Sequence, residues 1–181
     1  DPVAGTETPG GVLCANRKIV AMGEIQVPSG AKRIDARGTI VAPGFVDLGV
    51  FAADPYACAA GGITRVALMP DQSPVLDHPA LVARPTVARN PDLWVHPLAA
   101  TRRGLEGREL AEIGLMKAAG AVGVATGRGW IASSGVMARV FQYANAFDLP
   151  VITHAEDAAL ADGAVATAGE TATRLGLPSA P

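Results

Sequence analysis

The sequence contains little of what marks several common classes of protein. Aromatic residues make up only 4% of its 181 residues, which disfavours a platform for stacking nucleic-acid bases. The net charge is −2, whereas a nucleic-acid surface usually carries a clustered basic stripe. Arg102, Arg103 and Arg108 lie close together, and such a group is more typical of a solvated loop. No uninterrupted apolar run approaches the roughly 20 residues of a membrane span.

Cysteine is equally scarce. Cys14 and Cys58 are the only two, and they form neither a disulfide framework nor the spacing of a metal site. Cys58 lies in a run of small apolar residues, which predicts a buried, inert thiol. The start of the chain lacks the basic and then apolar pattern of a secretory signal. These features predict a cytoplasmic location, without membrane or nucleic-acid partners.

The composition of the chain is that of a globular protein. Apolar residues make up 49% of the chain and charged residues 18%, as in ordinary water-soluble domains. The length suits one domain, or a large one and a small one. The 21 glycines and 14 prolines lie between apolar runs and mark turns.

The first forty residues favour short strands. Asn16-Arg17 separates two brief apolar runs, which is a hairpin signal. Pro28-Ser29-Gly30 separates two more and is typical of a turn. We therefore expect a small β domain over residues 1–40, part of a β-sandwich, with strands at 12–15, 18–22, 25–28 and 33–36.

From about residue 41 strands alternate with helices. The apolar runs predict strands at 45–50, 63–69, 93–98, 121–125 and 151–154, and the amphipathic patterns predict helices at 79–88, 109–119 and 134–147. Ser133 or Ser134 can cap the last helix at its N-terminus, and Gly120 fits a left-handed stop after the second. Such alternation predicts a parallel sheet of an α/β fold, with right-handed crossovers.

The first crossover is shorter than the others. Only 18 residues separate the starts of the strands at Phe45 and Ile63, which is short for a connection that contains a helix. We therefore expect residues to be absent near Asp54. Five parallel strands also cannot close an eight-stranded barrel. Residues 41–181 are thus expected to form only the first half of a TIM-type barrel, within a larger protein.

Five phrases, at strand ends inferred independently, resemble dihydroorotases of the cyclic amidohydrolase superfamily. They start at Asp35, at Ala59, at Met69, at Gly104 and at Thr153, and they read DARGTIVAPGFVD, AAGGIT, MPDQSPVLD, GLEGRELAEI and THAED. The resemblance implies a hydrolase of cyclic amides in pyrimidine biosynthesis. It implies a (β/α)8 barrel whose zinc activates a water molecule.

The metal ligands that the resemblance implies are largely missing. The two imidazoles of the first strand correspond to Gly49 and Phe51, neither of which has a donor atom. The carboxylate or carboxylated lysine of the fourth strand corresponds to Thr126 or Gly127. Only His154, in the His-Ala-Glu-Asp phrase, remains as a vestigial candidate. A catalytic zinc needs three protein ligands and an open position.

The substrate-binding residues that the resemblance implies are also altered. The arginine of the first strand corresponds to Ala53, and the asparagine after the second corresponds to Asp71. An anionic side chain at Asp71 would repel a substrate carboxylate.

Other polar residues have structural interpretations. His96 suits a hydrogen-bonded core histidine, and His78 suits an exposed loop. Gly127-Arg128-Gly129 is typical of a turn. Asp71 and Asp77 could form an acid pair, although Asp77 also suits the cap of the helix that starts at Pro79.

Three hypotheses follow. The first is a non-catalytic homologue without a cofactor, acting as a structural or regulatory subunit. It resembles the inactive dihydroorotase-like chains that pair with aspartate transcarbamoylase, so we expect an oligomer with itself or with another chain. The second is an active zinc-dependent cyclic amidohydrolase that uses His154 with ligands from outside this sequence. The third is a sensor that binds a ligand in the old pocket. No catalytic residue can be assigned.

Overall fold

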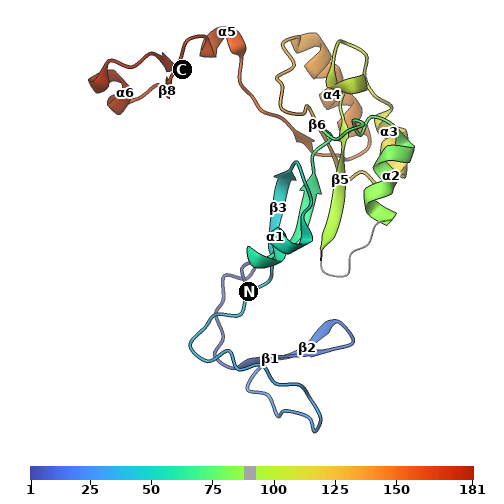
Figure 1. Ribbon diagram of the computed structural model, residues 1–181, viewed down its shortest axis with the longest axis vertical. Coiled ribbons are helices and arrows are strands. Elements are labelled where there is room, and N and C mark those ends of the chain that lie inside the picture. The colour runs from blue at the N-terminus through green and yellow to red at the C-terminus, as the bar shows by residue number, and fades with distance from the viewer. Residues whose placement is uncertain (88–92) are drawn as a thin grey trace. The chain divides into compact units, whose positions relative to one another are not determined.

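The computed structural model describes residues 1–87 and 93–181, and Figure 1 traces its elements. The chain divides into two compact units, Asp1–Gly44 and Phe45–Pro181. Among the described residues, the first unit contains a two-stranded sheet, and the second contains a five-stranded and a two-stranded sheet.

The first unit contains the expected hairpin. Strands β1 (Gly11–Ala15) and β2 (Lys18–Gly23) pair antiparallel. The two connecting residues, Asn16 and Arg17, both have positive φ, at 49° and 61°. That backbone twist matches the twist of the paired strands in a two-residue hairpin, so the prediction at this position is confirmed.

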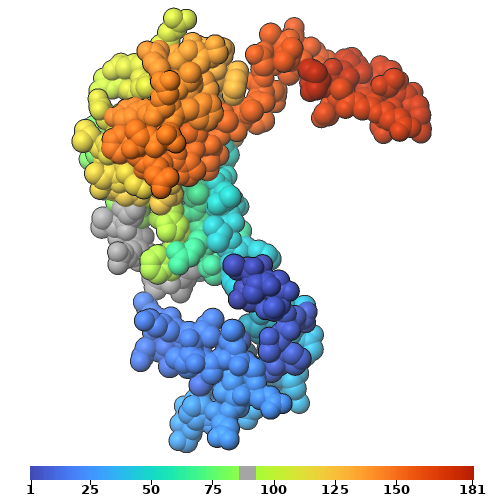
Figure 2. All heavy atoms as spheres, turned by 180° about the vertical axis from the view of Figure 1, so that it is seen from behind, coloured from blue at the N-terminus to red at the C-terminus, as the bar shows by residue number. Residues whose placement is uncertain are grey.

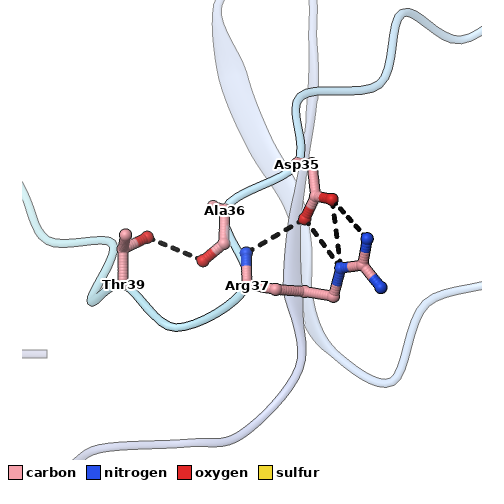
Figure 3. Close-up of polar contacts among 4 residues, drawn as sticks. All are labelled: Asp35, Ala36, Arg37 and Thr39. Carbon is pink, nitrogen blue, oxygen red and sulfur yellow. Dashed lines mark hydrogen bonds and ion pairs between the residues drawn. The ribbon is translucent and has the colours of Figure 1, made fainter.

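The strands expected at 25–28 and 33–36 are absent from this unit, and that part of the prediction was wrong. Instead, Asp35 organises a local turn, drawn in Figure 3. The Arg37 backbone N–H donates to Asp35 Oδ1 at 3.1 Å, and Arg37 Nη2 lies 2.6 Å from Asp35 Oδ2. Thr39 Oγ1 donates to the carbonyl of Ala36 at 2.7 Å. Such local bonds compete with a strand ladder. The neighbouring Arg37 also lowers the pKa of the Asp35 carboxyl.

The second unit is built on a parallel sheet of five strands in chain order: β3 (Phe45–Val50), β4 (Ile63–Leu68), β5 (Trp94–Ala100), β6 (Gly123–Ala125) and β7 (Val151–Ile152). Every neighbouring pair is parallel. Sequential parallel strands with helical crossovers are the pattern of a (β/α)8 barrel. The expected fold, a partial TIM-type barrel with a small β domain, is therefore confirmed.

Four helices connect these strands: α1 (Pro55–Ala60), α2 (Pro79–Val87), α3 (Ile113–Ala118) and α4 (Ser134–Ala146). Ser133 caps α4, because its Oγ accepts the N–H of Val136 at 3.4 Å. Helix α3 starts later than residue 109, since Leu110 instead bridges to Arg102 after β5. Gly120 follows α3 with a φ of 106°, as a stop requires.

Helix α1 corrects the expectation that the first crossover could hold no helix. Its six residues begin after Asp54, whose Oδ1 accepts the N–H groups of Tyr56 and Ala57. Pro55 occupies the first turn, where a missing N–H costs nothing. Cys58 of α1 is buried, as predicted, against Val66 and Leu93. A strong cap at one end and the glycine pair at 61–62 at the other make this short connection possible.

The core of the second unit lies mainly between the sheet and its helices. The largest cluster joins strand residues Leu68 and Val124 to Ile113 and Met116 of α3 and Ala144 of α4. In Figure 2 the residues of α3 and α4, yellow to orange, form one continuous packed surface. A smaller cluster contains Ala67, Met69, Leu98 and Ala125. The successive residues Ala67 and Leu68 of β4 therefore pack into different clusters, as the two-residue period of a strand requires.

The last residues form short local elements: α5 (Ala158–Ala161), β8 (Ala166–Thr167), α6 (Glu170–Leu175) and β9 (Ser179–Ala180). Strands β8 and β9 pair parallel. Asp157 caps α5 by accepting the N–H of Ala159 at 2.8 Å. Among the residues described, none of the helices combines the length and apolar character needed to cross a bilayer.

Gly123 tests how tightly β6 is packed. A Cβ there would lie 3.0 Å from Leu98 Cδ2 and 3.1 Å from the carbonyl oxygen of Pro150, an oxygen that accepts the N–H of Val124 and so cannot move freely. We expect Gly123→Ala to destabilise the fold by about 1–3 kcal/mol, as overpacking does. Denaturant unfolding would measure the change.

The matched control is Gly135→Ala in α4, where a new methyl would meet nothing within 4 Å. Alanine in a helix stabilises by about 0.5–1 kcal/mol relative to glycine. If both substitutions stabilised the protein equally, the packing described around β6 would be incorrect.

Candidate functional site

The carboxyl ends of the barrel strands are where active sites of this architecture lie. In this chain the residues that follow the five strands are Phe51, Asp71, Thr101, Arg128 and His154, in strand order. The set includes both site candidates named from the sequence, Asp71 and His154. We refer to this edge of the sheet as the mouth.

Phe51 lies at the mouth and contacts the positively charged side chain of Arg128. The guanidinium carbon of Arg128 lies 3.7 Å from the centre of the Phe51 ring, a close cation–π contact. Gln72 Nε2 donates to the main-chain oxygen of Phe51 at 3.1 Å and to that of Met69 at 3.0 Å. Gly49, two residues earlier in β3, contributes no side chain.

Asp71 also contacts the loop after β6. Its Oδ1 accepts the backbone N–H of Arg128 at 2.9 Å, across 57 residues of sequence. A Cβ at Gly127 would lie 2.9 Å from that same oxygen and 2.8 Å from Leu105 Cδ1. Oδ2 of Asp71 is buried and has no hydrogen-bond partner in the described part of the chain. Asp71 is therefore held by the chain rather than directed toward open solvent.

Asp77 is not part of this arrangement. Its Oδ2 accepts the N–H of Gly104 at 2.8 Å, which ties the segment before α2 to the short 3-10 helix η1 (Arg103–Leu105). The side chain that meets the first turn of α2 is that of His78, whose Nδ1 accepts the N–H of Ala80 at 3.3 Å. The expectations of an Asp71–Asp77 acid pair and of an Asp77 cap were both wrong. His78 is exposed, as predicted.

His154 follows β7 and pairs locally. Its Nε2 lies 2.7 Å from Glu156 Oε2, and both side chains are more than half exposed. Among the described residues there is no group of three or more histidine, cysteine, aspartate or glutamate side chains placed to hold a metal ion.

The donor set at the mouth does not fit a catalytic zinc. The side chains of Gly49 and Phe51 offer no lone pair to a metal, and the face of the Phe51 ring is covered by the positive charge of Arg128. The carboxylate of Asp71 is engaged by a backbone N–H. One imidazole with an exposed glutamate falls short of the three or four ligands that such a site requires.

His96 lies within β5 and is not at the mouth. Arg65 of β4 donates from Nη1 to His96 Nε2 at 3.3 Å, and the Arg65 guanidinium also lies 4.9 Å from the Trp94 ring. Partial burial, and then the charge of Arg65, lower the pKa of His96. These contacts fit the interpretation of His96 as a hydrogen-bonded structural histidine.

Sequence reasoning missed the role of Arg128. It was assigned to a turn between two glycines, and the turn is real, since Gly127 has a φ of 77°. The available signal was a single arginine three residues after the end of a strand, at the edge where barrel sites lie. Gln72 was missed as well, because a single glutamine in a loop carries no strong pattern.

We expect Arg65→Gln to raise the pKa of His96 toward the ordinary imidazole value, because it removes a like charge. Since the folded pKa is lowered, stability should fall as the pH drops from that ordinary value through the folded one. An NMR titration of the His96 ring would measure this. The control is Arg139→Gln on α4, where the guanidinium bonds within its own helix. An unchanged or lower pKa in Arg65→Gln would contradict the described contact.

Comparison with known proteins identifies the family. The profile of the Dihydro-orotase-like family matches residues 38–181. A dihydroorotase of Syntrophotalea carbinolica is 36% identical over the whole chain, which covers 46% of that protein. One from Pelotomaculum thermopropionicum is 37% identical, with 45% of its length covered.

The chain thus spans about half the length of these curated relatives. The alignments extend over 195 and 194 positions, against 181 residues in this chain, so each relative has residues without a counterpart here. The family match covers the whole second unit. This match and the partial coverage of the relatives both agree with a half-barrel of parallel strands. The chain belongs to the dihydroorotase-like family of cyclic amidohydrolases.

Proposed function

We propose that this chain is a non-catalytic dihydroorotase-like protein of pyrimidine biosynthesis, which acts as a structural or regulatory subunit. The observation that carries the proposal is the state of Phe51. It stands at a position where the family has a zinc-binding imidazole, and its ring is stacked on Arg128. A phenyl ring on a guanidinium cannot ligate a second cation.

The rest of the mouth supports the same conclusion. Hydrolysis of a cyclic amide in this family depends on a metal-bound water whose pKa is lowered to about 7. Gly49 supplies no ligand, and a carboxylate at Gly127 has no room beside Asp71. His154, the one remaining imidazole of the expected set, bonds to Glu156. None of the described residues at the mouth would generate the nucleophile.

The residues expected to hold a substrate carboxylate also support a non-catalytic role. Ala53 replaces an arginine, so a bidentate clamp on the carboxylate is missing. Asp71 replaces an asparagine, and its negative charge would repel the same group. Both changes weaken binding of dihydroorotate independently of the metal.

Apolar side chains of β3 are exposed in this half-barrel: Phe45 is 70% exposed, Val46 54% and Leu48 68%. β3 is an edge strand here, and in a closed barrel the remaining strands would pack against it. The proposed partner therefore rests on the resemblance alone. By resemblance to inactive dihydroorotase-like subunits, we propose aspartate transcarbamoylase as the partner, in an oligomer.

One observation favours the alternative of an active zinc-dependent hydrolase. His154 lies two residues after the end of β7, at the mouth, and its imidazole is exposed. Ligands from chain outside this sequence could join it there. The two functions differ in a measurable way, because only the hydrolase requires metal.

The first test is metal content and turnover of the full-length protein. We expect less than stoichiometric zinc and no hydrolysis of dihydroorotate above background, because the ligand positions at Gly49 and Phe51 are empty of donors. His154→Ala should change neither result. Stoichiometric zinc together with turnover that disappears in His154→Ala would establish the alternative.

The second test is assembly. Purified full-length protein mixed with aspartate transcarbamoylase from the same organism should form a complex of defined mass in size-exclusion chromatography with light scattering. Treatment with a chelator should leave the complex intact, because the proposed subunit holds no metal. Two separate peaks at micromolar concentrations would contradict the proposed partner.

A further inference from the structure

Phe51 and Asp71, two residues in which this chain departs from the family pattern, both contact Arg128. Phe51 follows β3, Asp71 follows β4 and Arg128 follows β6. We propose that these three residues form a strand-end brace, which holds the carboxyl ends of three barrel strands together where relatives have a metal site. The inference goes beyond the proposed function, since it concerns what stabilises the mouth and not what the protein does there.

The link between β3 and β6 is the stacking of Arg128 on Phe51. The distance of 3.7 Å from the guanidinium carbon to the ring centre is the van der Waals contact of two flat groups. The phenyl ring is 37% exposed, so most of its surface is already removed from water. Partial desolvation strengthens a cation–π contact relative to a fully exposed pair. This link joins residues that are 77 positions apart in sequence.

The link between β4 and β6 is made by the main chain of the same arginine. Asp71 Oδ1 accepts the Arg128 N–H at 2.9 Å. A hydrogen bond from a backbone N–H to a carboxylate is charge-assisted and stronger than one between neutral groups. Arg128 therefore reaches two strands at once, β3 through its side chain and β4 through its backbone.

Gln72 connects the remaining pair of strand ends. Its amide donates to the carbonyl oxygens of Phe51 and of Met69. The first bond fixes the backbone that carries the Phe51 ring, and the second fixes the end of β4. With this residue the contacts close a ring among β3, β4 and β6.

The departures also depend on one another sterically. A side chain at Gly127 would collide with Asp71 Oδ1, whereas glycine, at a φ of 77°, lets the next N–H approach that oxygen. The family carboxylate could not return at position 127 while Asp71 keeps this orientation. Likewise, without Arg128 the Phe51 ring would lose the group that covers its face. Such mutual dependence is expected of an adapted cluster and not of independent losses.

A double-mutant cycle on the full-length protein tests the brace. Phe51→Leu keeps an apolar side chain, and Arg128→Met keeps the length of the side chain without the charge. We expect each single substitution to raise the unfolding equilibrium constant. In the double variant this constant should rise by less than the product of the two single fold-changes. A coupling of about fivefold in the unfolding constant corresponds to the cation–π contact. Denaturant titration would measure it.

The matched control combines Phe51→Leu with Arg65→Met. Arg65 makes its own cation–π contact, with Trp94, on the same sheet. These two substitutions should act independently, with fold-changes that multiply. Independent fold-changes for Phe51→Leu and Arg128→Met would overturn the brace.

A second measurement does not depend on a large change in stability. Hydrogen exchange of the Arg128 amide should accelerate at least tenfold in Asp71→Ala and change less in Asp71→Asn, whose side-chain oxygen can still accept. Equal acceleration in both variants, or none in either, would overturn the β4–β6 link. Turnover with bound zinc would refute the proposed function but would leave the coupling and the exchange results unchanged, so the two failures are distinguishable.

Discussion

The stacking of Arg128 on Phe51, together with the bond from the Arg128 N–H to Asp71, is the interaction on which the mouth of this half-barrel depends. Parallel barrel strands bring their carboxyl ends together, and the side chains there must satisfy one another's charge and shape. Relatives of this architecture can use a metal for that purpose. Here an arginine supplies the positive charge, a phenyl ring supplies the surface beside it, and a carboxylate accepts its backbone N–H.

In this chain the residues that stabilise the fold are different from those at the positions where the family has its metal ligands. The sheet is stabilised by buried apolar side chains such as Val66, Leu98 and Val124, none of which would touch a metal. Ligand positions lie beyond the strand ends, where a substitution leaves this core intact. The family match across residues 38–181 therefore establishes the fold, while activity has to be argued from the site.

The sequence allowed the fold to be predicted where local pattern and tertiary structure agree. The strand at residues 45–50 was predicted with its observed bounds, because it is rich in apolar residues and β-branched valine, although most of its side chains are exposed in this half-barrel. The strands expected at 25–28 and 33–36 failed, since Asp35 bonds to its neighbour Arg37 and no partner strand competes with that turn. Helix α1 was missed because its stability comes from the Asp54 cap and not from length.

The candidate site was less predictable than the fold, for a related reason. Asp71 and His154 were located by resemblance, and both follow strands as expected. The partner of Asp71, however, lies 57 residues away, and the arginine that covers Phe51 lies farther still. Contacts of this range depend on how the strands pack side by side. No periodicity in the sequence reports them, so Arg128 could be read only as part of a turn.

The polar lining of the mouth suits the proposal that this chain holds no metal. Thr101 and Thr126 are almost completely buried, and Thr126 Oγ1 bonds to Thr153 Oγ1 at 3.3 Å. A buried carboxylate without a neighbouring cation costs several kcal/mol, on the order of the whole stability of a small domain, whereas a buried hydroxyl costs about 1–3 kcal/mol even when it lacks a partner. Neutral threonines are therefore tolerated at these strand ends without zinc. The carboxylate that does remain in the loop after β4, Asp71, is the one that Arg128 engages. Asp71 Oδ1 is thus paired with a backbone N–H, whereas its buried Oδ2 has no hydrogen-bond partner among the described residues.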